Sequence, residues 1–233
     1  CVIDDHGMQM SHVIRGEDHL SNTARQLMIY DAFGWETPVF AHISMVLGSD
    51  RQKLSKRNGD TSVRDYLEKG YLKEALINFL CFLGWSPKES ANLKPVSGHP
   101  EILSFEELVN TFDLDGLQKS PAIFDTEKLK WMNAQYLRTL PLVEIAERSK
   151  PFFKNFTFEK EIFDTSSEWY NQMIALLRER VTLLSELPEA SRLFFEDEPN
   201  LDEAALKILK DPNAPLVLNA YADQLNAVTE ITE

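Results

Sequence analysis

Hydrophobic and polar positions along the first fifty residues predict short strands and one helix. Residues 39–47 alternate in the way expected of a largely buried strand. Residues 1–15 hold two short apolar segments around a turn sequence, which predicts a hairpin. Ser21 or Asn22 should then cap a helix that Gly34 ends. The order strand, helix, strand is typical of an α/β nucleotide-binding layer, and only the last part of such a layer is expected here.

From residue 62 onward, apolar residues recur at the three-to-four spacing of amphipathic helices. Ser62 begins a sequence that resembles a capping box, Ser104 begins a complete one, and Asp125 stands where a third cap is expected. Residues 142–233 are helical throughout by pattern, with one continuous helix over residues 170–187. The chain is therefore predicted to be mostly α-helical, with a partial α/β layer at its beginning.

Composition and charge narrow the class of protein. No apolar run approaches the roughly 18 residues of a membrane helix. The formal net charge of −13 argues against coating nucleic acid through bulk charge. Cys1 and Cys81 have neither metal-site nor disulfide spacing, which favours a reducing cytoplasm. The chain starts without Met or a signal peptide and ends without a stop signal, so a fragment of a longer protein is expected.

A basic segment follows the predicted strand and its glycine, and it is the first candidate for chemistry. It reads Lys53-Leu54-Ser55-Lys56-Arg57. A lysine ammonium is a mobile point charge that suits phosphate. An ammonium and a phosphate about 4 Å apart attract by roughly 4 kcal/mol at an effective dielectric constant of 20. Taken alone, these five residues fit a solvated surface turn equally well.

A second candidate segment, Arg15-Gly16-Glu17-Asp18, lies at a predicted strand-to-helix turn. Ligands of α/β folds bind beyond the carboxyl ends of strands. Arginine can form a bidentate pair with a carboxylate, and the two acids can accept from an ammonium or a ribose hydroxyl. The acids alone also suit a helix N-terminus, where the helix dipole favours negative charge. The combination with the basic segment favours a nucleotide site.

These two segments belong to a longer, ordered series of motifs. The series comprises Val2–His6, His12–Thr23, Phe33–Trp35, Phe40–His42, Lys53–Arg57, Gly70–Leu72, Glu74–Leu80, Leu83–Pro87, Ser120–Asp125 and Lys128–Asn133. Together they resemble the second half of the catalytic domain of bacterial-type glutamyl-tRNA synthetases, a class I family, and the region that follows it. Residues 53–57 correspond to the family's Lys-Met-Ser-Lys-Ser signature. The resemblance is dense over residues 1–138 and collinear to about residue 200.

The resemblance implies a Rossmann-like catalytic part, a stem-contact region and an α-helical anticodon-binding bundle. Residues 1–60 would be the C-terminal part of the catalytic domain with its ATP loop, residues 61–139 the stem-contact region, and residues 140–233 an incomplete anticodon-binding region. The family's first signature, of the His-Ile-Gly-His type, is absent from this sequence. The resemblance therefore implies a glutamate–tRNA ligase of which this fragment alone has negligible activity.

The resemblance also implies a two-step reaction and assigns its residues. Glutamate would attack the α-phosphate of Mg-ATP to give glutamyl-adenylate, and the acyl group would pass to the terminal ribose of tRNA(Glu). Arg15 would contact glutamate, and Lys53 and Lys56 would be catalytic. The residues expected to bind ATP are Asp18, Met45, Val46, Lys53, Leu54, Ser55, Lys56 and Arg57. Mg²⁺ would enter with ATP, and no metal ligands are expected in the chain.

Arg180 is expected on a helix, where an arginine of the family favours glutamate anticodons over glutamine ones. An ordinary exposed helix arginine is the alternative. Three other functions stay open: a glutaminyl enzyme, whose C-terminal part should be β-rich, a shorter paralogue that glutamylates a modified tRNA base, and a non-catalytic tRNA-binding module. The expected partners are glutamate, ATP and tRNA(Glu), without a membrane, for a cytoplasmic monomer.

Overall fold

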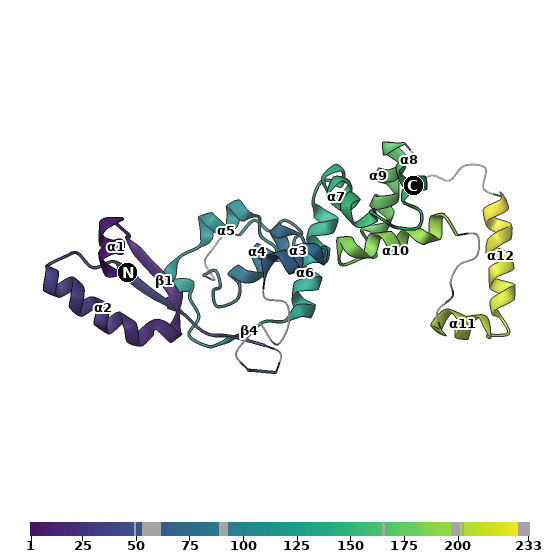
Figure 1. Cartoon of the computed structure of the whole chain (residues 1–233). Helices are drawn as coiled ribbons and strands as arrows, with labels where there is room; N and C mark the ends of the chain where they lie inside the picture. Colours follow the sequence, from purple (N-terminus) through teal and green to yellow (C-terminus); the bar gives the residue numbers. More distant parts are fainter. Residues whose placement is uncertain are drawn as a thin grey trace. The chain divides into compact units, whose positions relative to one another are not determined.

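The computed structural model describes residues 1–48, 50–52, 62–88, 93–164, 166–196, 201 and 203–227. This part is mostly α-helical with four short strands, so the predicted fold class is confirmed (Figure 1). The chain divides into two compact units, Cys1–Ser191 and Arg192–Glu233.

The partial α/β layer consists of β1 (His12–Gly16) and β2 (Val39–Ile43), which pair in parallel. Parallel strands need a crossover connection, and α2 (Leu20–Phe33) supplies it. α2 ends, as predicted, at Gly34, whose φ of 65° is left-handed. The helix begins earlier than predicted, because Ser21 and its neighbour lie within its first turn.

The predicted hairpin over residues 1–15 is wrong, because Val2–Gly7 forms the helix α1. The N-terminal amine donates to Asp4 Oδ2 at 2.7 Å. Asp4 and Asp5 lie in the first turn, where the positive end of the helix dipole favours carboxylates. The apolar run at the start of the chain is too short for its periodicity to distinguish a strand from a helix.

The strand predicted over residues 39–47 is two strands in two sheets. Ser44 and Met45 separate β2 from β3 (Val46–Leu47), and β3 pairs in parallel with β4 (Ala122–Ile123). Within residues 39–47, Ala41 and Ser44 are buried, Val39 is exposed, and the other side chains are partly buried. The break places two backbone residues between the sheets, at the edge where β2 ends.

Side-chain caps begin the next helices. Ser62 Oγ accepts from the Asp65 N–H at 3.2 Å and Asp65 Oδ2 accepts from the Ser62 N–H, which confirms the capping box of α3 (Val63–Glu68). Asp125 Oδ1 accepts from two N–H groups at the start of α6 (Thr126–Thr139), as predicted.

The capping box predicted as complete at Ser104 is only half formed. Ser104 Oγ accepts from the Glu107 N–H at 3.0 Å at the start of α5 (Phe105–Thr111). The Glu107 carboxylate accepts instead from the Lys94 N–H at 3.1 Å. A tertiary contact has replaced the local one, which the sequence pattern alone does not show.

The later helices of the first unit are α7 (Leu142–Ser149), α8 (Glu159–Asp164), α9 (Ser167–Leu177) and α10 (Leu187–Ser191). The continuous helix predicted over residues 170–187 is therefore wrong, since the chain leaves helical geometry between α9 and α10.

Gly70 packs against the chain within this break. Its φ is 90°, and a Cβ there would lie 2.5 Å from the Ser185 N and 2.9 Å from the Leu184 N. The Leu184 N–H donates to the Gly70 carbonyl at 3.0 Å. In a continuous α-helix that N–H would bond to the carbonyl four residues earlier. The contact with Gly70, which follows α3, therefore takes the place of helix continuation.

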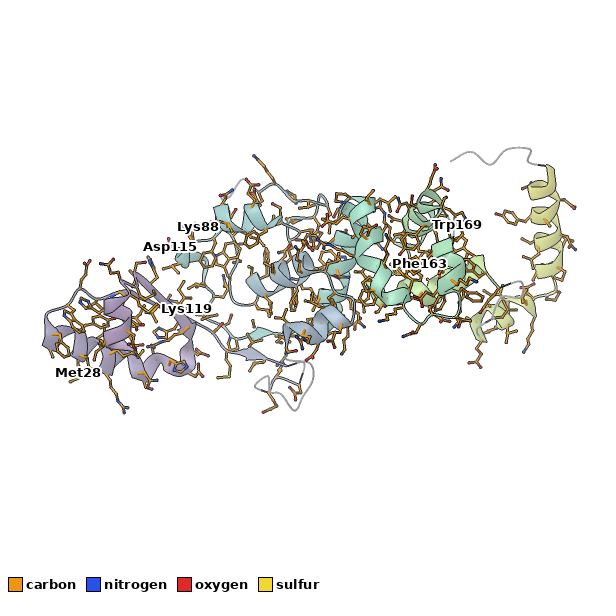
Figure 2. The ribbon with its side chains drawn as sticks, turned by 45° about the horizontal axis from the view of Figure 1, so that its top comes forward. Met28, Lys88, Asp115, Lys119, Phe163 and Trp169 are labelled. Atoms are coloured by element: carbon orange, nitrogen blue, oxygen red, sulfur yellow. The ribbon has the colours of Figure 1, made fainter. Side chains whose placement is uncertain are left out.

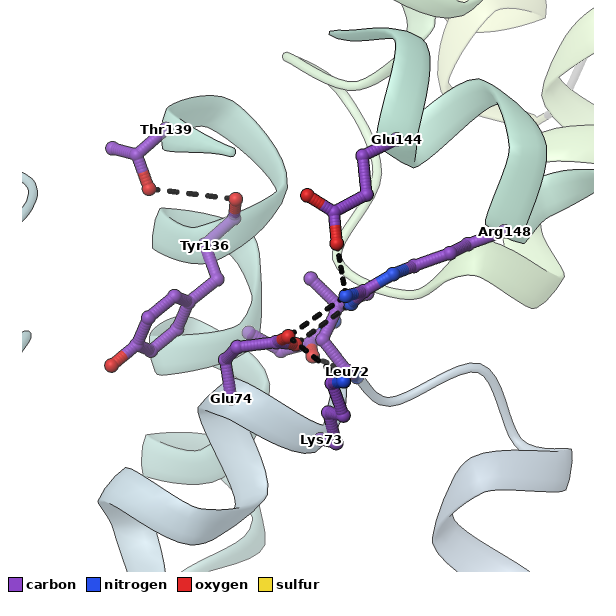
Figure 3. Close-up of polar contacts among 8 residues, drawn as sticks. Leu72, Lys73, Glu74, Tyr136, Thr139, Glu144 and Arg148 are labelled. Atoms are coloured by element: carbon purple, nitrogen blue, oxygen red, sulfur yellow. Dashed lines mark hydrogen bonds and ion pairs between the residues drawn. The ribbon is translucent and has the colours of Figure 1, made fainter. Parts of the chain in front are cut away.

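An ion pair joins α4 (Lys73–Cys81) to α7 (Figure 3). The Arg148 guanidinium donates to both oxygens of Glu74, at 2.7 and 2.8 Å, and also contacts Glu144. The side chains of Glu74 and Arg148 are only 21% and 25% exposed. Burial is the largest single influence and raises the pKa of Glu74. The hydrogen bonds from Arg148, the Glu74 backbone N–H and the charges of Arg148 and Lys73 together outweigh it and leave this pKa below its ordinary value.

The second unit contains α11 (Glu203–Leu209) and α12 (Ala214–Ala227). Arg192 and Glu196 form an ion pair at 2.8 Å at its beginning. Among the helices in the described part of the chain, none is long and apolar enough to cross a membrane.

Candidate active site

The carboxyl ends of β1 and β2 meet at one edge of the parallel pair. A cavity of about 430 Å³ lies there, lined by Gly16–Asp18 and Ile43–Val46. Its size suits a small molecule, and its place follows the rule for ligands of α/β sheets. The structure thus brings together Asp18, Met45 and Val46, three of the residues that the sequence predicts for ATP.

The backbone on the β2 side of the cavity is fixed by two hydrogen bonds at Met45. Glu17 Oε1 accepts from the Met45 N–H at 3.0 Å, and the Met45 carbonyl accepts from the Ala122 N–H at 3.1 Å. In a parallel ladder only alternate residues bond to a given neighbouring strand. The N–H and C=O of Val46 therefore point away from β4.

Arg15 is held on the side of β1 that faces α2. Its Nη2 donates to Thr23 Oγ1 at 2.6 Å and to Gln26 Oε1 at 2.7 Å. His42 Nε2 lies 2.9 Å from the same Thr23 oxygen, and the guanidinium lies 5.3 Å from the centre of the Phe40 ring. These contacts fix the orientation of the guanidinium on its strand.

One buried donor of Arg15, its Nε, has no hydrogen-bond partner within the described part of the chain. A buried donor without a partner costs about 1–3 kcal/mol. Arg15 is not among the residues that line the cavity, and its buried Nε is closed to solvent in this arrangement.

Gly16 gives the Asp18 side chain its room. A Cβ at position 16 would lie 2.5 Å from Asp18 Oδ1, so the carboxylate folds back over the glycine backbone. Asp18 is exposed and lines the cavity. Its carboxylate is therefore accessible to a ligand bound there.

A second cavity of about 470 Å³ shares Glu17 and Ser44 with the first. Its other wall includes Asp115 and Lys119, which Figure 2 labels. Lys88 lies 3.0 Å from the Asp115 carboxylate. Ser44 is 6% exposed, and its Oγ has no hydrogen-bond partner in the described part of the chain.

The basic segment Lys53-Leu54-Ser55-Lys56-Arg57 lies outside the described residues, so the roles predicted for it stay predictions. Just before it the chain turns, with the Gly48 N–H donating to the Gln52 carbonyl at 2.8 Å. Within the described ranges, no group of three or more His, Cys, Asp or Glu side chains could hold a metal ion.

Arg180 does not lie on a helix, which corrects the sequence prediction. α9 ends at Leu177, and the Arg180 N–H donates to the Leu177 carbonyl at 2.9 Å in the turn that follows. The Arg180 side chain is exposed. Its predicted role at the anticodon stays a prediction.

Sequence reasoning missed the residues that hold the site together. Glu17 was a candidate for accepting from a ligand, and the structure gives it a backbone partner within the chain. No site role was predicted for Thr23 and Gln26, although their spacing of three places them on one face of a helix. That spacing alone does not show which residue of a neighbouring strand the two side chains contact.

Two family profiles match the chain. The profile described as tRNA synthetases class I (E and Q), catalytic domain, matches residues 1–131, and that of an anticodon binding domain matches residues 144–233.

Curated relatives and solved structures agree with these profiles. The glutamate–tRNA ligase of Aquifex aeolicus is 46% identical; the match covers 96% of this chain and 45% of that protein. The glutamate–tRNA ligase of Carboxydothermus hydrogenoformans is 45% identical; the match covers 97% of this chain and 46% of that protein. The crystal structure of a glutamate tRNA ligase from Elizabethkingia meningosepticum, in complex with its amino acid, is 32% identical with a TM-score of 0.74. The match covers 98% of this chain and 46% of the Elizabethkingia chain. The chain thus spans about half the length of the curated relatives it matches.

Proposed function

This chain belongs to the family of class I tRNA synthetases (E and Q), and from that premise we propose that the whole protein is a glutamate–tRNA ligase. In the first step the glutamate α-carboxylate attacks the α-phosphorus of Mg-ATP, and the bond to pyrophosphate breaks. In the second step a ribose hydroxyl at the 3′ end of tRNA(Glu) takes the acyl group, and AMP leaves. The observation that carries the proposal is the cavity at the carboxyl ends of β1 and β2, together with Arg15.

The roles of individual residues follow from their chemistry. Arg15 binds a glutamate carboxylate through its guanidinium group. Asp18 and the backbone at Met45 and Val46 contact ATP. Mg²⁺ enters with the nucleotide as part of the substrate. The segment Lys53-Leu54-Ser55-Lys56-Arg57 closes over the triphosphate, with Lys53 and Lys56 stabilising charge on phosphate in the transition state.

The proposed regions are residues 1–60 for the catalytic part, 61–139 for stem contact and 140–233 for anticodon binding. The end of α6 at Thr139 supports the second boundary. The anticodon-binding match at residues 144–233 favours this function over a paralogue that ends after its catalytic domain. The proposed protein is a cytoplasmic monomer that binds glutamate, ATP and tRNA(Glu).

The Lys56→Ala variant of the full-length protein tests the proposal. We expect glutamate-dependent ATP–pyrophosphate exchange, measured with tRNA(Glu) present, to fall about 10²–10³-fold in kcat, the loss typical of one transition-state donor. Lys160→Ala, at an exposed lysine of α8, is the matched control and should retain wild-type exchange. Wild-type exchange in the Lys56 variant would refute its role, and no glutamate-dependent exchange in the wild-type protein would refute the function.

A further inference from the structure

We propose that Glu17 is a positioning residue of the nucleotide site. Its carboxylate holds the backbone at Met45 so that Val46 presents its N–H and C=O to the adenine base of ATP. The inference rests on the proposed function, because it takes the cavity beside Glu17 to be the ATP site.

The backbone at Met45 needs this support because it lies between two sheets. β2 pairs with β1 and ends at Ile43, whereas β3 pairs with β4 and begins at Val46. The described partner of the Met45 N–H belongs to neither ladder, since it is Glu17 Oε1 at 3.0 Å. Without that acceptor, the connection between the sheets would lose one of its two fixed points, the other being the bond from Ala122.

The hydrogen bond between Glu17 and Met45 lies at the rim of the cavity and not at a distance from it. Glu17 follows Gly16 in the turn after β1, so its bond to Met45 joins the ends of both parallel strands across the cavity rim. Glu17 also lines both cavities. The neighbouring acid, Asp18, is the one expected to contact ATP, which leaves the Glu17 carboxylate to shape the rim.

The chemistry of the bond predicts which substitutions are tolerated. An N–H donor requires an acceptor oxygen and not a negative charge, and glutamine keeps that oxygen at the same reach. Glu17→Gln should therefore behave like the wild type, and Glu17→Ala should not. Because Glu17 acts through the backbone that faces adenine, the loss should appear in the KM for ATP and not in the KM for glutamate.

The test is steady-state ATP–pyrophosphate exchange by the full-length protein with tRNA(Glu) present, varying ATP and glutamate separately. We expect Glu17→Ala to raise the KM for ATP about tenfold, the size expected for one lost hydrogen bond, with the KM for glutamate within about twofold. Glu17→Gln should stay within about threefold for ATP. Glu36→Ala, an exposed acid between α2 and β2, is the control and should change nothing. Thermal unfolding of each variant shows that it is folded.

Three results would overturn the inference: an unchanged KM for ATP in Glu17→Ala, equal rises for ATP and glutamate, or a Glu17→Gln variant as impaired as Glu17→Ala. An impaired Glu17→Gln variant would mean that ATP binding depends on the negative charge of Glu17 and not on its acceptor oxygen. If the wild-type protein shows no exchange, the proposed function fails, and direct titration with ATP decides the inference instead. A Kd about tenfold weaker in Glu17→Ala supports it, whereas equal values or no ATP binding by the wild type overturn it.

Discussion

At the scale of single residues, the pair of Glu74 and Arg148 makes stability depend on pH. The pKa of Glu74 lies below its ordinary value in the folded chain, because hydrogen bonds and the nearby charges of Arg148 and Lys73 together outweigh burial. The pair therefore stabilises the fold fully above the unfolded pKa of glutamate, about 4.3. This stabilisation is lost as the pH falls through the lower folded pKa.

Glu74→Gln should lower the free energy of unfolding by about 1–2 kcal/mol at pH 7, discounted for the partial exposure of the pair. The difference from wild type should shrink towards pH 3, where the wild-type carboxyl is also neutral. Urea titrations at both pH values measure it. Glu127→Gln, at an 81% exposed acid paired with Lys130, is the control and should cost less than about 0.5 kcal/mol. A difference that is the same at both pH values would contradict the explanation.

Arg180 carries a prediction about recognition at the same scale. Its side chain is exposed in the turn after α9, where it is accessible to an RNA base. We expect Arg180→Gln in the full-length protein to reduce the preference for tRNA(Glu) over tRNA(Gln) by roughly 5–150-fold, the equivalent of one base contact worth about 1–3 kcal/mol. Charging of the two tRNAs in parallel measures this ratio. An unchanged ratio of charging between the two tRNAs would contradict the proposed role of Arg180 at the anticodon.

At the scale of elements, some local signals were reliable, whereas contacts between distant segments were not predictable. The caps at Ser62 and Asp125 were predicted because a side chain three or fewer residues away decides them. The split of residues 39–47 was missed because β3 is selected by β4, about 75 residues later. α1 was missed because three apolar residues fit either state. In the site, the position of Arg15 was predictable from its motif, and its partners on α2 were not.

Gly70 carries the prediction for elements. Gly70→Ala should destabilise the first unit by about 2–4 kcal/mol, since a Cβ would meet the backbone of residues 184 and 185 at a positive φ. Gly7→Ala is the matched control, because a Cβ there meets no atom within 4 Å, and it should stay within about 0.5 kcal/mol of wild type. Guanidinium titrations of both variants give the comparison. Equal midpoints would show that the close approach of Gly70 to residues 184 and 185 does not stabilise the first unit.

At the scale of the whole molecule, we expect this chain to supply only part of the proposed active site. The described cavity is lined by the ends of β1 and β2 and the residues just after them, and the chain spans about half of its curated relatives. We expect the 233-residue chain alone to show negligible glutamate-dependent ATP–pyrophosphate exchange. Exchange above background by this chain would contradict that expectation and would make the described residues and the basic segment sufficient for activation.

The most direct test of the central claim is charging of tRNA by the full-length protein. Radiolabelled glutamate or glutamine is supplied with Mg-ATP and tRNA(Glu), and the label that precipitates with the tRNA is counted. We predict ATP-dependent incorporation of glutamate at the 3′ end and little or none of glutamine. Incorporation of glutamine in preference to glutamate, or of neither, would contradict the assignment of this chain to a glutamate–tRNA ligase.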